Sequence, residues 1–133
     1  GKKEESDKTL RETALRETEE EIGIKKELIT IIGELTQVYI PPSGFLVQPY
    51  IGFIKGTPSF STDQNEVNTL IETPVRLFMD NTIVGKKKIK VGSSNIKINY
   101  PFYNILGQTV WGATAMMLSE LKEVLKGNSE IPK

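Results

Sequence analysis

Three glutamates near the start of the chain have the residue type and spacing to do chemistry. Glu17, Glu20 and Glu21 are spaced i, i+3 and i+4, so they share one face of an α-helix. Like charges at this spacing destabilise a helix, and a cation bound among them removes the repulsion. Oxygen-only ligands favour Mg²⁺, Mn²⁺ or Ca²⁺, and Mg²⁺ usually completes its shell with water and substrate phosphate. The spacing indicates either a cation site for a phosphate-bearing substrate or an exposed acidic helix without a ligand.

The composition narrows the remaining chemistry to carboxylates and hard cations. The 133 residues include no Cys and no His, which excludes disulfides, thiolate nucleophiles, imidazole metal sites and a Ser-His-Asp triad. Seventeen basic residues balance seventeen acidic ones, so we expect no nucleic-acid partner. The chain has no apolar run of about 18 residues, so we expect no membrane span. The lack of cysteine is compatible with the cytoplasmic location that we expect.

A helix over residues 7–22 is predicted to carry the glutamates. Ser6 or Asp7 is its expected N-cap, and Gly23 stands where a left-handed residue ends a helix. Residues rich in β-branched side chains follow this helix and predict strands. The further predicted elements are strands at 27–38 and 45–55 joined by the turn Pro41-Pro42-Ser43-Gly44, a polar loop at 57–65, a strand at 66–72, a short helix from Pro74 through Asp80, strands at 87–92 and 95–99 with a turn at 91–94, and an amphipathic helix at 110–126 closed by Gly127.

The pattern predicts one domain over residues 1–127, followed by a frayed tail at 128–133. Trp111, Met116 and Met117 fall on or near the apolar stripe of the last predicted helix, so we expect them in the core rather than in a ligand site. Lysines at 86–88 are expected on a surface hairpin, with contact to phosphate as the alternative.

The segment from Arg16 to Ile24 resembles the signature of the Nudix hydrolases. That signature reads Gly-x5-Glu-x7-Arg-Glu-U-x-Glu-Glu-x-Gly-U, where U is a bulky apolar residue, and only Thr18 departs from it within this segment. Upstream, eight residues rather than seven separate Asp7 from Arg16. That spacing is similar to the coenzyme A pyrophosphatase branch of the family. Stretches similar to the same branch are GKKEESDKTLRETALRE, QPYIGFI, NEVNTLIETPV and VWGATAMMLSEL.

The resemblance implies an α/β fold, a Nudix-type α/β/α sandwich with a mixed sheet between helices. Family members normally carry several dozen residues before the motif, which supply sheet strands and end in Pro-Gly-Gly. We therefore expect this sandwich to lack its N-terminal strands, with Gly1 as the last glycine of that pair. A sheet without those strands would expose unpaired edges, and pairing of two copies in a homodimer is one way to cover them.

The resemblance also implies roles for individual residues. Glu17, Glu20 and Glu21 would hold Mg²⁺ or Mn²⁺, and Arg16 would orient Glu20 or a neighbouring carboxylate. Glu66 is the best candidate for the general base, and its alternative is a solvent-facing strand residue. The residues expected near the substrate phosphates are Gly1, Lys2 and Lys3.

The activity implied is metal-dependent hydrolysis of a diphosphate linkage in a nucleoside diphosphate derivative. Coenzyme A or acyl-coenzyme A is the leading substrate, split into (acyl-)phosphopantetheine and adenosine 3′,5′-bisphosphate. ADP-ribose or another nucleoside diphosphate derivative is the alternative within this class. A Nudix-like binding domain without turnover usually lacks motif carboxylates, and here all three are present. A further alternative is that the chain is an incomplete and inactive piece.

Overall fold

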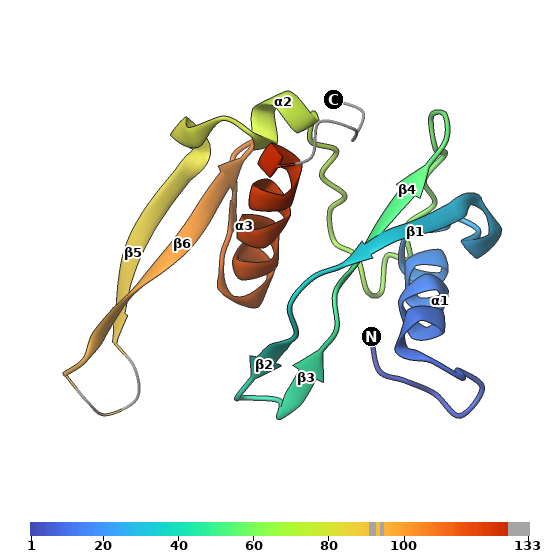
Figure 1. Cartoon of the computed structure of the whole chain (residues 1–133), viewed down its shortest axis with the longest axis horizontal. Helices are drawn as coiled ribbons and strands as arrows, with labels where there is room; N and C mark the ends of the chain where they lie inside the picture. The colour runs from blue at the N-terminus through green and yellow to red at the C-terminus, as the bar shows by residue number, and fades with distance from the viewer. Residues whose placement is uncertain (91–92, 94, 128–133) are drawn as a thin grey trace. The chain divides into compact units, whose positions relative to one another are not determined.

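The contacts of the chain divide it into two compact units. The computed structural model describes residues 1–90, 93 and 95–127, and Figure 1 shows their helices and strands in chain order. Unit 1 covers Gly1–Leu70 and unit 2 covers Ile71–Lys133. None of the helices in the described part of the chain is long and apolar enough to cross a lipid bilayer.

Helix α1 (Leu10–Ile22) of unit 1 begins later than the sequence predicts. Thr9 is its N-cap, and the Thr9 hydroxyl accepts a hydrogen bond from the N–H of Glu12 at 3.2 Å. Asp7 is buried and its carboxylate accepts hydrogen bonds from a guanidinium further along the helix. The prediction of Ser6 or Asp7 as the N-cap is therefore wrong, because a carboxylate held in this way is not free to cap.

The C-terminal end of α1 is covered by the loop that follows β4. Gly23 has a φ of 71°, which confirms the predicted left-handed residue. The N–H of Ser61 donates to the carbonyl of Ile22 at 3.0 Å. The N–H of Asp63 donates to the carbonyl of Glu21, also at 3.0 Å. The last four carbonyls of a helix have no partner within it, so this loop satisfies two of them and is held against the helix end.

Two antiparallel strand pairs complete unit 1. Strand β1 (Ile29–Glu34) pairs with β4 (Tyr50–Ile54), and β2 (Val38–Ile40) pairs with β3 (Phe45–Val47). The turn predicted between the middle strands is confirmed. A single-turn 3₁₀ helix, η1 (Lys26–Leu28), leads into β1.

Helix α1 lies beside the β1–β4 pair in Figure 1, and apolar side chains of both elements line a cavity of about 310 Å³ between them. Thr18, which departs from the apolar residue of the Nudix signature, lines this cavity. Its hydroxyl donates to the carbonyl of Ala14 at 2.7 Å. A threonine is accommodated on this apolar face because its polar atom is bonded within the helix.

Unit 2 packs a helix against one face of a three-stranded antiparallel sheet of order β5-β6-β7. Its core contains Phe78, Tyr103, Ile105 and Ala115. The rings of Phe78 and Tyr103 lie 5.9 Å apart, and the Tyr103 hydroxyl is hydrogen-bonded to Ser119 Oγ at 2.9 Å. The elements of unit 2 are α2 (Val75–Phe78), the 3₁₀ helix η2 (Asn81–Ile83), β5 (Val84–Lys90), β6 (Lys97–Ile105), β7 (Gln108–Val110) and α3 (Gly112–Gly127).

The α/β class is confirmed, with helices and small antiparallel sheets. Among the described residues every strand pair is antiparallel, so the parallel pairs of a mixed sheet are not seen in them. The strand predicted at 66–72 is wrong, because the N–H groups of Glu66 and Val67 donate to the carbonyl of Asp63 in a local turn. The turn predicted at 91–94 and the tail predicted at 128–133 fall on residues outside the described ranges.

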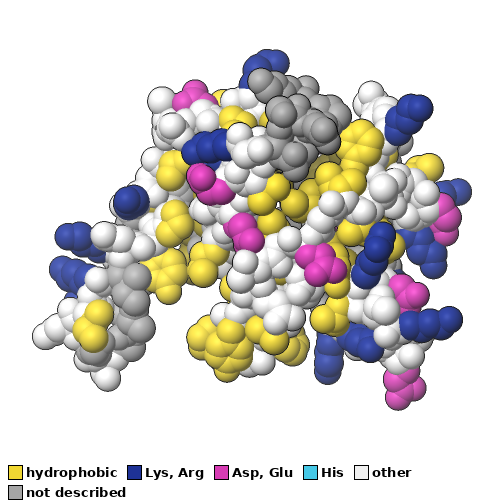
Figure 2. All heavy atoms as spheres, viewed as in Figure 1, with side chains coloured by type: hydrophobic (Ala, Val, Ile, Leu, Met, Phe, Trp, Pro, Cys, Tyr) yellow, Lys and Arg dark blue, Asp and Glu magenta, His cyan; other side chains and the backbone are white. Residues whose placement is uncertain are grey.

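Several large apolar side chains lie on the surface. Trp111 is 66% exposed and Met116 is 46% exposed, so the prediction that these two lie in the core is wrong. The core-facing stripe of α3 is formed instead by Ala115 and by leucines one, two and three turns further on. Figure 2 shows another apolar cluster, at the tip of the β2–β3 hairpin, where Tyr39 and Phe45 are exposed.

Replacing Gly23 with alanine tests the contact between the loop and the end of α1. A Cβ at Gly23 would lie 2.6 Å from the backbone oxygen of Ser61, in addition to the strain of a positive φ. Gly44 has a similar φ of 69° with no atom within 4 Å of such a Cβ, so Gly44→Ala is a matched control for strain alone. We expect Gly44→Ala to cost about 1 kcal/mol and Gly23→Ala about 2–3 kcal/mol in thermal unfolding. Equal losses would show that the loop contact adds nothing.

Candidate metal centre

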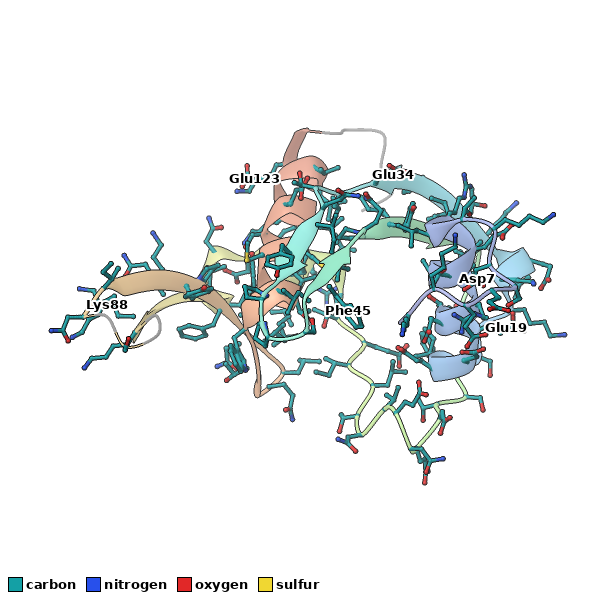
Figure 3. The ribbon with its side chains drawn as sticks, turned by 90° about the horizontal axis from the view of Figure 1, so that it is seen from below. Asp7, Glu19, Glu34, Phe45, Lys88 and Glu123 are labelled. Atoms are coloured by element: carbon teal, nitrogen blue, oxygen red, sulfur yellow. The ribbon has the colours of Figure 1, made fainter. Side chains whose placement is uncertain are left out.

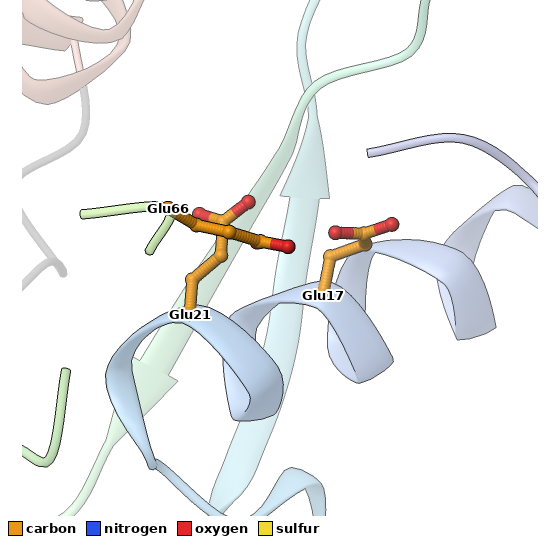
Figure 4. Close-up of side chains that lie close together, drawn as sticks. All are labelled: Glu17, Glu21 and Glu66. Carbon is orange, nitrogen blue, oxygen red and sulfur yellow. The ribbon is translucent and has the colours of Figure 1, made fainter. Parts of the chain in front are cut away.

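Three carboxylates from two segments converge in unit 1. Glu17 and Glu21 lie one turn apart on the same face of α1, and Glu66 comes from the loop after β4 (Figure 4). One oxygen of each carboxylate lies within 4.8 Å of an oxygen of the other two. Glu17 and Glu21 are half-buried, whereas Glu66 is exposed. The cluster therefore opens to solvent on the side of Glu66.

The position of Glu66 follows from backbone hydrogen bonds. The carbonyl of Asp63 accepts from the N–H groups of Glu66 and Val67 at 3.1 and 2.8 Å. The Asp63 carboxylate accepts from the N–H of Asn65 at 2.9 Å, as in an Asx turn. Because the N–H of Asp63 is itself bonded to the carbonyl of Glu21, the turn that carries Glu66 is tied to the helical turn that carries Glu21.

Arg16 joins the N-terminal segment to the acidic face of α1. Its Nη1 donates to Glu20 Oε2 at 2.9 Å and lies 3.3 Å from Glu17 Oε1. Its Nη2 donates to the carbonyl oxygen of Lys2 at 2.9 Å. The Glu20 carboxylate is thus directed to Arg16 and is not part of the group formed by Glu17, Glu21 and Glu66. The Asp7 carboxylate, by its hydrogen bond, raises the pKa of Arg16 above its already high ordinary value.

Asp7 is the anchor of this guanidinium. Its carboxylate accepts from Arg16 Nε at 3.1 Å and Nη2 at 3.0 Å, and its side chain is only 5% exposed. It also accepts from the Thr13 hydroxyl at 3.0 Å and the N–H of Glu4 at 3.0 Å. The hydrogen bond from Arg16 is the main reason why the pKa of Asp7 lies far below its usual range. The hydrogen bonds from Glu4 and Thr13 lower this pKa further, and burial opposes them.

The structure brings most of the predicted site residues together. A Cβ on Gly1 would collide with the Glu17 carboxylate, so the first residue lies directly against the cluster. Lys2 meets Arg16 through its backbone, while the side chains of Lys2 and Lys3 are exposed to solvent. The anchoring role of Asp7 was missed by sequence reasoning. The sequence feature that could have indicated this role is that Asp7 occupies the position of the upstream glutamate in the Nudix signature.

The donor set fits a hard divalent cation. All three groups are carboxylates, which are the ligands of Mg²⁺ and Mn²⁺ rather than of softer metals. Neighbouring ligands of one octahedral Mg²⁺, each at about 2.1 Å from the ion, lie about 3 Å apart. The oxygens here lie within 4.8 Å of one another, so the side chains would draw together to hold one ion. The residues present therefore suit Mg²⁺ or Mn²⁺.

Comparison with known proteins places the first half of the chain in a described family. The family model for the NUDIX domain matches residues 1–69, more than half of the 133 residues. A protein of Yersinia enterocolitica named "uncharacterized Nudix hydrolase NudL" is 31% identical over 123 residues, which are 92% of this chain and 62% of that protein. Its namesake from Pectobacterium atrosepticum is 31% identical over 125 residues, 91% of this chain and 62% of that protein. The chain thus spans less than two thirds of the length of these relatives.

The Arg16–Asp7 interaction predicts a specific loss of stability in acid. A carboxylate with a lowered folded-state pKa contributes stability above its unfolded pKa of about 4, and this contribution is lost as the pH falls below it. We expect Asp7→Asn to lower the melting temperature at pH 7, and its difference from the wild type to narrow steadily below about pH 4. Exposed Glu5 lies in the same segment, so Glu5→Gln is the control and should follow the wild-type profile. A gap that stays constant with pH would contradict the charge-based anchor.

Proposed function

Because the chain belongs to the Nudix family, we propose that its protein catalyses metal-dependent hydrolysis of a diphosphate linkage in a nucleoside diphosphate derivative. The observation that supports this most is the group of three carboxylate oxygens from Glu17, Glu21 and Glu66, which suits a hard cation. The intact motif carboxylates weigh against the alternative of a Nudix-like binding domain without turnover.

The metal ligands are proposed from both sequence and geometry. Glu17 and Glu21 belong to the motif set and to the observed cluster. Glu20 belongs to the motif set but is paired with Arg16, so it would reach an ion only by giving up that ion pair. A bound Mg²⁺ or Mn²⁺ would neutralise charge that develops on the diphosphate and would lower the pKa of a water molecule. Glu66 would act either as a third ligand or as the base that accepts the proton of the attacking water.

Arg16 acts in this proposal as a positioning residue. It contacts Glu17 and Glu20 and is fixed by Asp7 from the opposite side, so it sets where the motif carboxylates lie. Gly1 leaves room beside Glu17, where a larger residue would collide, and this allows close backbone approach. The exposed side chains of Lys2 and Lys3, next in the chain, are free to meet substrate phosphates.

The proposed substrate is coenzyme A or an acyl derivative, with ADP-ribose as the alternative. The support is the spacing of Asp7 and Arg16 and the later stretches similar to the coenzyme A branch. The test incubates the 133-residue chain with each compound, with Mg²⁺, with Mn²⁺ and with chelator, and identifies products by mass. Adenosine 3′,5′-bisphosphate formed only with metal supports the coenzyme A assignment. Metal binding without hydrolysis of either compound would favour the alternative of a Nudix-like binding domain without turnover. The same assay on a chain extended upstream would then distinguish that alternative from an incomplete and inactive piece, because only the incomplete piece should gain activity on extension.

Substitutions on α1 should affect metal binding and stability in opposite directions. We expect Glu17→Gln and Glu21→Gln to weaken Mn²⁺ affinity at least about tenfold in calorimetric titration. Without metal, Glu21→Gln should melt at or slightly above the wild type, because a like-charge repulsion is removed. Glu17→Gln should melt close to the wild type, because it also loses the ion pair with Arg16 at 3.3 Å. Glu34→Gln, at an exposed position of β1, is the matched control and should change neither property. Unchanged Mn²⁺ affinity in both variants would contradict the proposed site.

Glu20→Gln and Glu66→Gln separate the remaining roles. We expect Glu20→Gln to abolish metal-dependent turnover with little change in the melting temperature. If Glu66 is the base, Glu66→Gln should lower kcat about 10²–10⁴-fold while Mn²⁺ affinity stays near the wild-type value. If Glu66 is a ligand, the Mn²⁺ affinity falls with kcat. Wild-type rates in Glu20→Gln would contradict its assignment.

A further inference from the structure

The β2–β3 hairpin of unit 1 lies within a long stretch of chain that has no charged side chain. Residues 35–54 contain no Asp, Glu, Lys or Arg, although 26% of the whole chain is charged. Strand β2 follows β1 and β3 precedes β4, so the hairpin extends the β1–β4 pair (Figure 1). Its turn, residues 41–44, is exposed. Whatever contacts this tip is therefore bound without ion pairs.

Large apolar side chains are exposed on both faces of the hairpin. Tyr39 pairs with Leu46, and Ile40 pairs with Phe45. Directly opposed residues share a face, and successive residues of a strand point to opposite faces. Tyr39 and Leu46, 60% and 57% exposed, therefore lie on one face, and Phe45, 50% exposed, lies on the other. Figure 3 labels Phe45, the first residue of β3 after the turn. A strand pair with one face in water normally carries polar residues on that face, and this hairpin has no such face.

The backbone of the turn leaves no amide donor that needs water. The first two residues of the turn are prolines, which have no N–H. The N–H groups of Ser43 and Gly44 donate to the carbonyl oxygen of Ile40 at 3.2 and 2.9 Å. The Ser43 hydroxyl donates to the same oxygen at 3.2 Å and accepts from the N–H of Phe45 at 3.3 Å. Because an unpartnered donor is costly outside water, this turn is suited to leaving water.

Polarity increases in steps from the tip of the hairpin to its base. Gln37 and Gln48 border the two strands and are polar without charge, and the first charged side chains beyond them are Glu34 and Lys55. Each strand has three residues, so at about 3.3 Å per residue the apolar part is about 10 Å long. This order and this length fit the boundary of a lipid bilayer, where apolar side chains enter by about 5–10 Å.

The exposed area of the tip separates a membrane from a protein partner. Large side chains such as Tyr and Phe have about 150–250 Å² each, so Tyr39, Phe45 and Leu46, exposed by 50–60%, together present about 300 Å². A stable protein–protein interface buries about 800 Å² on each partner, so the tip alone is too small to hold a second copy or another protein. A bilayer sets no such minimum, because binding increases with whatever apolar area enters it.

We propose that the tip of the β2–β3 hairpin inserts into the interfacial region of a lipid bilayer and attaches the protein reversibly to a membrane surface. Phe45, next to the turn, enters deepest, and Tyr39 places its hydroxyl near the headgroups, where tyrosine is enriched in membrane proteins. The hairpin contributes no residue to the carboxylate cluster of α1 and Glu66, so this attachment is independent of hydrolysis.

The basic strand β5 of unit 2 is the other surface that a membrane would attract. Lys86, Lys88 and Lys90 are exposed on it, and residues 81–119 contain no Asp or Glu. Lysines attract anionic lipids, and salt screens this attraction. Attachment through the hairpin needs neither anionic lipid nor low salt, because the tip carries no charge. Lipid composition and ionic strength therefore distinguish the two surfaces.

The first test is sedimentation of the 133-residue chain with vesicles of pure phosphatidylcholine, which have no net charge. We expect the chain to sediment with these vesicles and to stay in solution without them. The bound fraction should be unchanged when NaCl is raised from about 50 to about 500 mM, because no charge pairs are involved.

Insertion itself is measured by fluorescence. Trp111 is the only tryptophan of the chain, so the double variant Phe45→Trp/Trp111→Phe moves the single fluorophore to the tip. Its emission should shift to shorter wavelength with phosphatidylcholine vesicles and be quenched by lipids brominated in their acyl chains. The wild type, with its tryptophan in unit 2, is the control and should show neither change.

Variants at the tip assign the binding to the exposed side chains. We expect Phe45→Ser/Leu46→Ser to bind vesicles at least about tenfold more weakly, because less apolar area enters the bilayer. Ile96→Ser removes another exposed apolar side chain, 64% exposed and outside the hairpin, and should bind as the wild type does. Leu46→Asn alone, with an intermediate loss, serves if the double variant does not unfold cooperatively.

Four results would overturn membrane insertion by the hairpin. The first is no sedimentation above the vesicle-free control, and the second is wild-type binding by the tip variants. The third is binding only to vesicles that contain phosphatidylserine, lost at high salt, which would assign attachment to the lysines of β5. The fourth is a dimer in light scattering that dissociates in the tip variants and does not bind vesicles, which would show that a second copy covers the tip.

Discussion

The guanidinium of Arg16 is the interaction on which the acidic face of α1 depends. Carboxylates of like charge on adjacent turns favour a frayed helix unless a cation lies near them. Arg16 supplies a permanent positive charge at that face, and Asp7 holds it there through two nitrogen donors. Because Asp7 is also bonded to Thr13 and Glu4, the segment before the helix and its first turns are joined at one carboxylate. The carboxylates proposed as metal ligands can therefore be ordered in the absence of a metal.

A second constraint comes from the unsatisfied carbonyls at the end of α1. The loop after β4 donates to them, and Gly23 gives that loop room to approach. A helix end needs such partners in any protein, so the loop is recruited by a general requirement of helices. The functional consequence is that Glu66, more than forty residues from the motif, lies beside Glu21. The contacts that satisfy the helix end are therefore the same contacts that place Glu66 in the cluster.

Sequence reasoning reached the parts of this site that depend on local periodicity. Helical spacing places Glu17 and Glu21 on one face, and Gly23 at a helix end is identifiable from its type alone. The strand expected at 66–72 failed because Asp63 forms a turn with its own neighbours, and a β-branched run does not reveal that competition. Asp7 looked like a cap because caps and ion-pair anchors use the same residue type. Trp111 was expected in the core because it falls on or near the apolar stripe of a helix predicted to begin at residue 110, whereas α3 begins at Gly112 and leaves Trp111 exposed before it.

The attachment of the loop by its main chain has an evolutionary consequence. Ser61 and Asp63 bind the helix through backbone N–H groups, which every amino acid except proline possesses. Side chains at position 61 can therefore drift among homologues without loosening the loop. Position 63 tolerates fewer side chains, because the Asp63 carboxylate also accepts a hydrogen bond from the N–H of Asn65. Asn, Ser or Thr at this position would preserve that hydrogen bond. A family alignment would record this architecture as an exclusion of proline at two variable-looking positions rather than as an invariant residue.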